Sequence, residues 1–225
     1  MIELEDFLEK LGIITNNMDI YEIAFIHSSY STTHGLEHDY ERLEFLGDSV
    51  LNMLVADYIF HKYPNYGEGN LTKMRANYVC QSALIYYSKQ LGLDKFIKIS
   101  TEEHNMGHND VLSISADVFE SFLGAIYIDQ GIEKAREYLE NNIFKYIDMG
   151  KIFFYDYKSI IKEYGDAQEI PVSYETINEY GVSHDKTFVI QILVNGHPLG
   201  KGTGKNKKEA EQLAAQQAIE YLNIN

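Results

Sequence analysis

The sequence has few of the features that mark secreted, disulfide-bonded or membrane proteins. Its 225 residues include one cysteine, Cys80, so no disulfide can form within the chain, and a reducing compartment suits it. No apolar run approaches the ~18 residues that a membrane span needs. The start, MIELEDFLEK, is acidic and differs from a signal or transit peptide. We therefore expect a cytoplasmic protein with no membrane partner.

Positive charge is also scarce. The chain has 19 Lys and Arg against 34 Asp and Glu, a formal net charge of −15. Binding to nucleic acid requires positive charge facing the phosphates. This composition argues against a general affinity for nucleic acid, so any nucleic-acid site must be a local basic patch.

Residues 1–148 have the apolar spacing of helices and contain only one of the three prolines. Turn residues such as those at 63–67 and 129–131 separate the apolar-periodic segments. The pattern predicts an all-α domain at 1–148 with helices over 3–11, 19–28, 41–62, 70–90, 111–129 and 132–147.

A second, smaller domain is expected at 157–225, after a linker at 149–156. The Asn195-Gly196 pair is typical of the two-residue turn in a β-hairpin. This domain has the order helix, three strands, helix, with helices over 157–165 and 207–222 and strands over 171–178, 186–194 and 197–203.

An acidic motif lies in the predicted helix at 41–62, where residues 41–51 read ERLEFLGDSVL. Glu41, Glu44 and Asp48 are three and four residues apart, so they share one face of a helix. Glycine destabilises a helix interior by about 1 kcal/mol relative to alanine. Gly47 between two of these carboxylates therefore indicates a close approach of another backbone.

A second acidic pair, Asp117 and Glu120, has the same helical spacing in the predicted helix at 111–129. If the two helices pack together, their carboxylates form an all-oxygen site. Oxygen ligands select hard divalent ions such as Mg²⁺ or Mn²⁺. A di-iron helical bundle would need Glu-x-x-His pairs, and neither motif contains one.

Five lysines and no acidic residue occur between positions 186 and 208. Asn206 suits a helix N-cap and Glu209 the third helical position. Lys207 and Lys208 would then lie in the first turn, where the helix dipole disfavours cations. An anion bound at this helix end, such as a phosphate, would explain them. The cluster consists of Lys186, Lys201, Lys205, Lys207 and Lys208.

The motifs ERLEFLGDSVL and SADVFESFLG (115–124) closely resemble those of ribonuclease III, and GTGKNKKEAEQ (202–212) resembles the end of a double-stranded-RNA-binding domain. The resemblance implies an all-α nuclease domain followed by a small α-β-β-β-α RNA-binding domain. It also implies a homodimeric, metal-dependent endoribonuclease without a small-molecule cofactor. Such an enzyme cuts double-stranded RNA, including ribosomal RNA precursors, and leaves 5′-phosphates and staggered 3′-hydroxyl ends.

The resemblance also assigns roles to individual residues. It implies that Mg²⁺, for which Mn²⁺ can substitute, is bound by Glu44, Asp48, Asp117 and Glu120, with Asp48 and Glu120 as the catalytic pair. The secondary acidic positions are Glu41, Glu68 and Glu103, although neighbouring Glu102 fits the last position equally. The implied RNA contacts are His184, Lys162, Lys205, Lys207 and Lys208.

Two further expectations concern assembly and activity. Phe45 and Leu46, on the helix of the first motif, are the candidates for the contact between subunits. The alternative function is an inactive scaffold that binds double-stranded RNA without cutting it. A degenerate site would be expected to lose carboxylates, and this sequence retains them.

Overall fold

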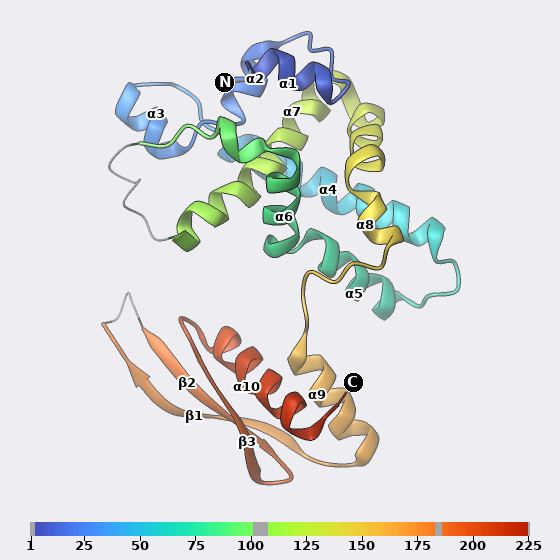
Figure 1. The fold of residues 1–225 in the computed structure, drawn as a ribbon, viewed down its shortest axis with the longest axis vertical. Helices are drawn as coiled ribbons and strands as arrows, with labels where there is room; N and C mark the ends of the chain where they lie inside the picture. The colour runs from blue at the N-terminus through green and yellow to red at the C-terminus, as the bar shows by residue number, and fades with distance from the viewer. Residues whose placement is uncertain (1–2, 101–107, 183–185, 225) are drawn as a thin grey trace. The chain divides into compact units, whose positions relative to one another are not determined.

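The computed structural model describes residues 3–100, 108–182 and 186–224, with residues 108–111 described by their backbone alone. The chain divides into two compact units, Met1–Phe154 and Tyr155–Asn225, which Figure 1 colours from blue to yellow and from light orange to red. No described helix is long and apolar enough to cross a membrane. Each unit has its own hydrophobic core.

The described part of the first unit is helical, and α7 runs through its middle (Figure 1). Aromatic side chains fill much of its core, with Phe122 in contact with Phe7, Tyr21, Phe25 and Tyr138. The helices are α1 (Leu4–Lys10), α2 (Met18–Ile23), α3 (Ser28–His34), α4 (Glu41–Lys62), α5 (Glu68–Val79), α6 (Gln81–Leu91), the 3-10 helix η1 (Leu93–Phe96), α7 (His108–Asn142) and α8 (Phe144–Asp148).

The bounds of α4 agree with the predicted helix at 41–62. The single helix predicted over 70–90 is wrong, because Cys80 has an extended backbone (φ −72°, ψ 156°) and separates α5 from α6. The predicted break near residue 131 occurs at Gly131 (φ 80°), where α7 is kinked. Past this kink the helix ends at Asn142, short of the predicted 147. Two short elements, α3 and η1, have no counterpart in the prediction.

Two glycines allow α4 and α7 to pack with their backbones in contact. A Cβ atom at Gly47 would lie 1.8 Å from the carbonyl oxygen of Glu120, and one at Gly124 would lie 2.3 Å from that of Leu43. Any larger residue would force the helices apart. The close backbone approach predicted at Gly47 is therefore confirmed, and it brings the two acidic motifs together.

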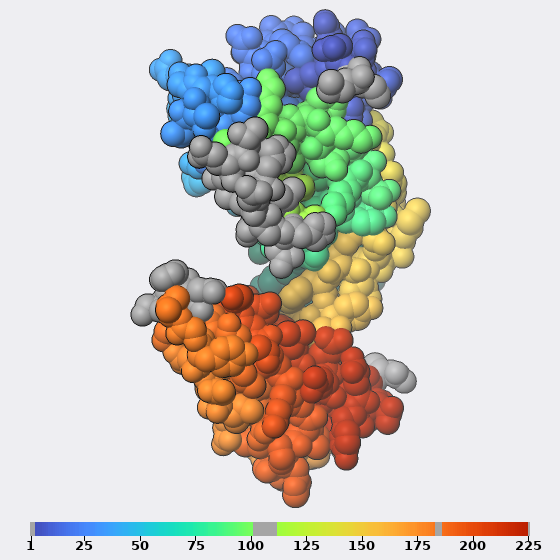
Figure 2. Space-filling view, turned by 60° about the vertical axis from the view of Figure 1, so that its left-hand side comes forward, coloured from blue at the N-terminus to red at the C-terminus, as the bar shows by residue number. Residues whose placement is uncertain are grey.

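The second unit is a three-stranded antiparallel sheet, in the order β1-β2-β3, with a helix before and after it. Asn195 (φ 53°) and Gly196 (φ 74°) form the predicted hairpin turn. Helix α10 packs closely on β3, where a Cβ at Gly202 would lie 2.0 Å from the carbonyl oxygen of Ala210. Strand residues (orange) and α10 residues (red) share the face seen in Figure 2. The elements are α9 (Tyr157–Gln168), β1 (Val172–Tyr180), β2 (Thr187–Val194), β3 (His197–Gly204) and α10 (Lys207–Leu222).

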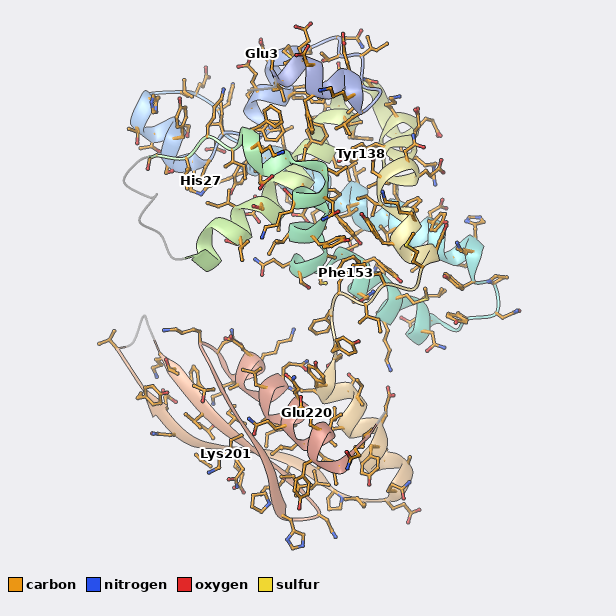
Figure 3. The ribbon with its side chains drawn as sticks, viewed as in Figure 1. Glu3, His27, Tyr138, Phe153, Lys201 and Glu220 are labelled. Atoms are coloured by element: carbon orange, nitrogen blue, oxygen red, sulfur yellow. The ribbon has the colours of Figure 1, made fainter. Side chains whose placement is uncertain are left out.

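Residues 151–154 of the predicted linker are held against the first unit. The Asn77 side chain donates to the carbonyl of Lys151 (2.9 Å) and accepts from the backbone N–H groups of Phe153 (2.8 Å) and Phe154 (3.0 Å). The Phe153 ring lies among tyrosines, including Tyr86 at 5.3 Å between centroids, and Figure 3 labels it. Residues 151, 153 and 154 therefore belong structurally to the first unit.

Replacing Gly47 with alanine tests the helix contact. We expect the free energy of unfolding to fall by about 2 kcal/mol or more, because the clash involves backbone atoms that no side-chain rotation can relieve. Gly69→Ala in α5 is the matched control: its Cβ would meet no atom within 4 Å, so it should stabilise the protein by about 0.5–1 kcal/mol. Urea unfolding measures both. Equal effects would contradict the role of Gly47.

Candidate active site and nucleic-acid interface

Five carboxylates line one open pocket of about 510 Å³ in the first unit. Glu41, Glu44 and Asp48 come from α4, and Asp117 and Glu120 come from α7. Tyr40 and Phe45 complete the lining. The two motifs that lie about seventy residues apart in the sequence thus meet at the contact between the helices, and we call this hollow the acidic pocket.

Neutral side chains orient two of the carboxylates. The Tyr40 hydroxyl donates to Asp117 Oδ2 at 3.1 Å, and the Asn52 side-chain amide donates to Asp48 Oδ1 at 2.7 Å. Neither donor carries a charge. Among the described residues that line the pocket there is no lysine, arginine or histidine to balance its negative charge.

The electrostatics of the acidic pocket follow from this crowding. Burial, then repulsion from Asp117, Glu41 and Asp48, raises the pKa of Glu44 to about 7. Burial, then repulsion from Asp48, Glu44 and Asp117, raises the pKa of Glu120 to about 8. Both values lie well above the ~4.3 of a free glutamate. Near neutral pH a large fraction of both side chains is therefore protonated. A nearby cation would favour their ionised forms.

The donor set suits a hard divalent ion, because every charged group in the lining is a carboxylate. Among the described residues, however, no three His, Cys, Asp or Glu side chains are arranged to hold a metal ion. Repulsion between the four carboxylates that were predicted to bind the ion keeps their side chains apart. Binding an ion would require them to turn toward one another within the pocket.

The other acidic candidates have different locations. Glu68 is at the start of α5, accepts a hydrogen bond from the Thr72 hydroxyl at 3.0 Å, and does not line the acidic pocket. Glu103, with the alternative Glu102, lies outside the described residues. Sequence reasoning missed Tyr40, because its hydrogen bond to Asp117 is a tertiary contact between residues 77 positions apart.

The predicted N-cap of α10 is confirmed. The Asn206 side chain accepts from the backbone N–H of Glu209 at 2.9 Å. The Glu209 carboxylate accepts from the backbone N–H of Lys205 at 2.8 Å, one residue before the position expected in a capping box. The exposed Lys207 and Lys208 therefore occupy the first turn of the helix, as the sequence pattern indicated.

The structure revises the lysine cluster in one respect. Lys186 forms an ion pair with Glu179 of β1, an acidic residue just outside the segment from 186 to 208. Lys162 is exposed on α9, and Lys201 is exposed on β3 (Figure 3). His184 lies outside the described residues. Lys205, Lys207 and Lys208, around the start of α10, are exposed and remain candidates for contact with phosphate.

The raised pKa values predict how the stability of the protein depends on pH in a buffer that contains a metal chelator. Between about pH 4.3 and pH 8 Glu120 retains a proton in the folded protein that it has lost in the unfolded chain, so its contribution to the free energy of unfolding falls as pH rises. Glu120→Gln cannot ionise. At pH 8 the free energy of unfolding of this variant should exceed that of wild type by a few kcal/mol. One pKa unit corresponds to about 1.4 kcal/mol, and the partial exposure of Glu120 reduces the full effect. Near pH 4 the two should agree.

Urea unfolding at several pH values measures this difference. Glu68→Gln, which changes an exposed glutamate outside the acidic pocket, is the matched control and should follow wild type. A difference between Glu120→Gln and wild type that stays constant from pH 4 to pH 8 would contradict the electrostatic account.

Comparison with known proteins identifies a family for each of the two units. Residues 17–147 match the family model described as Ribonuclease-III-like, and residues 157–222 match the double-stranded RNA binding motif. Ribonuclease 3 of Listeria innocua is 42% identical over 226 residues, 99% of this chain and 99% of the relative. Ribonuclease 3 of Staphylococcus aureus is 39% identical over 220 residues, 96% of this chain and 90% of the relative.

A solved structure supports the fold of the first unit. The nuclease domain of ribonuclease III from Campylobacter jejuni is similar at a TM-score of 0.59 and 33% identity, covering 64% of this chain and 97% of that one. The expected architecture, an all-α domain followed by an α-β-β-β-α domain, is confirmed. The chain belongs to the ribonuclease III family of endoribonucleases and carries a double-stranded-RNA-binding domain after its nuclease domain.

Proposed function

We propose that the acidic pocket hydrolyses phosphodiester bonds of double-stranded RNA with Mg²⁺, for which Mn²⁺ can substitute. The products are 5′-phosphates and staggered 3′-hydroxyl ends, and the substrates are structured RNAs such as ribosomal RNA precursors. The observation that carries this proposal is the meeting of carboxylates from α4 and α7 in one pocket, whose described lining includes no cationic side chain. An inactive scaffold has no need for such a costly concentration of charge.

Each carboxylate has a role in this proposal. Glu44, Asp48, Asp117 and Glu120 would bind the ion, with Asp48 and Glu120 nearest the chemistry and Glu41 at the rim. A divalent ion in such a site lowers the pKa of a bound water and neutralises charge that develops on the phosphate. A bound cation would lower the raised pKa values of Glu44 and Glu120, because it favours their ionised forms. The Asn52 amide would hold Asp48 in place.

The second unit would bring the duplex to the pocket. Double-stranded RNA is recognised through its shape, phosphates and 2′-hydroxyl groups. Lys205, Lys207 and Lys208 at the start of α10 would contact phosphates, supported by the helix dipole. Lys162 on α9 and His184, between β1 and β2, would contact the minor groove. Such contacts carry little sequence information, so duplexes of different sequence should bind similarly.

A homodimer would let two acidic pockets serve the two strands. Three large apolar side chains of α4 are exposed: Phe45 is 79% exposed, Phe60 63% and Met53 50%. Apolar hollows of about 740 and 780 Å³ adjoin it, the first lined in part by Met53 and Phe60 and the second by Phe45 and Leu46. Exposed apolar surface of this kind is typical of an interface. The region studied in the Campylobacter jejuni nuclease domain is one involved in dimer formation.

Two variants, assayed with the same RNA duplex, separate cleavage from binding. Glu120→Gln should abolish cleavage in Mg²⁺ and leave duplex affinity within about twofold, because Glu120 would bind metal rather than RNA. Lys207→Ala with Lys208→Ala should weaken binding of all duplex sequences alike. It should also reduce the slope of log affinity against log salt by about one per lost phosphate contact.

Glu140→Gln, which changes an exposed glutamate of α7 that does not line the acidic pocket, serves as the control for both assays. Cleavage by Glu120→Gln within about tenfold of wild type would refute the catalytic assignment. An unchanged salt slope in the double lysine variant would place the phosphate contacts elsewhere. Absence of cleavage by the wild-type protein, with binding intact, would favour the scaffold.

Mixed dimers test whether each pocket cuts one strand. One subunit is wild type, and the other carries Asp48→Asn and Glu120→Gln. Purified mixed dimers should nick duplex RNA without producing double-strand breaks, because a two-fold axis matches the approximate dyad of the duplex backbone. Denaturing and native gels distinguish nicks from breaks. Efficient double-strand breaks, or full activity from a monomer, would contradict the one-pocket-per-strand arrangement.

A further inference from the structure

Tyr40 connects the two halves of the acidic pocket. Its carbonyl oxygen accepts from the backbone N–H of Glu44 at 2.9 Å, in the first turn of α4, and its hydroxyl donates to Asp117 on α7. Its own backbone N–H donates to the carbonyl of Ile26 at 2.9 Å. One residue thus contacts the start of one acidic helix and a carboxylate of the other.

The Tyr40 ring is held so that its hydroxyl has little freedom. It is only 4% exposed and packs edge-on against the His27 ring, with 5.7 Å between centroids. Figure 3 labels His27, which lies just before α3. Asp117 itself is half-buried on α7. The direction of the hydroxyl, and with it the orientation of the carboxylate, is therefore fixed by packing.

We propose that Tyr40 is a positioning residue, whose hydroxyl holds the Asp117 carboxylate ready to bind the divalent ion. This inference rests on the proposed function of the acidic pocket. An ionised carboxylate offers about four lone-pair sites, and Tyr40 uses one of them, which leaves the others for a cation. A lysine or arginine at this position would compete with the ion through its charge, whereas a phenol orients the carboxylate and adds none.

The same unit contains a matched control. Tyr21 donates to Asp129 Oδ2, also at 3.1 Å, from a fully buried ring, but neither residue lines the acidic pocket. Tyr21→Phe and Tyr40→Phe therefore remove the same type of hydrogen bond at the same distance. A general loss of stability should follow from both variants. A loss of metal binding should follow from Tyr40→Phe alone.

The experiment measures Mn²⁺ binding to the full-length protein without RNA, from the electron paramagnetic resonance signal of free Mn²⁺. Wild type, Tyr40→Phe, Tyr21→Phe and Asp117→Asn are compared at a temperature below the melting point of each. Loss of a residue that orients a metal ligand typically weakens binding about 10- to 100-fold, so Tyr40→Phe should weaken it by about tenfold or more. Tyr21→Phe should remain within about twofold of wild type.

RNA cleavage provides a second readout on the same proteins. The KM of Tyr40→Phe for the duplex should stay near the wild-type value, because the Tyr40 side chain is only 4% exposed and offers RNA little surface. Its kcat should fall at low Mn²⁺ and recover at high Mn²⁺, which a structural defect would not do. A Mg²⁺ titration of wild-type protein labelled with ¹³C at tyrosine Cζ should shift the signal of the pocket tyrosine, and this measurement requires no variant to fold.

The outcomes separate the inference from the function on which it rests. If Asp117→Asn weakens Mn²⁺ binding and Tyr40→Phe does not, Tyr40 has no positioning role and the proposed metal site stands. If Asp117→Asn binds like wild type, the proposed metal role of Asp117 fails, and the inference fails with it. Equal losses in Tyr40→Phe and Tyr21→Phe, or tyrosine signals that Mg²⁺ leaves unmoved, would also overturn the positioning role.

Discussion

The contact between α4 and α7 is the constraint on which the rest of the first unit depends. Gly47 and Gly124 allow the two helix backbones to touch, and no other residue type would fit. This contact lies directly beneath the carboxylates, so the glycines that unite the core also set the spacing of the acidic pocket. A substitution at Gly47 or Gly124 would therefore disturb both the packing of the two helices and the positions of the carboxylates.

The acidic pocket stores electrostatic repulsion that the fold must offset. Burial and neighbouring carboxylates raise the pKa values of Glu44 and Glu120, which means that their charged forms are unfavourable in the folded protein without a cation. The large aromatic core of the same unit supplies the compensating stability. Such concentrated strain is expected at a functional site and would serve no purpose in a scaffold.

Local sequence signals predicted the elements whose causes are local. The bounds of α4, the N-cap at Asn206 and the turn at Asn195-Gly196 each follow from residues within one or two turns of the feature. The break at Cys80 did not, because its extended backbone leaves no strong mark on the sequence. The pairing of Lys186 with Glu179 and the reach of Tyr40 to Asp117 depend on tertiary contacts, which periodicity cannot reveal.

Anomalous diffraction from crystals soaked in Mn²⁺ tests most directly the claim that two helices build one metal site. A metal site shared by the two helices should give an anomalous peak in the acidic pocket, roughly 2.0–2.3 Å from carboxylate oxygens of both α4 and α7. The Tyr40 hydroxyl should still donate to Asp117 when the ion is bound. A pocket without a peak, or an ion held by carboxylates of one helix alone, would refute the shared site.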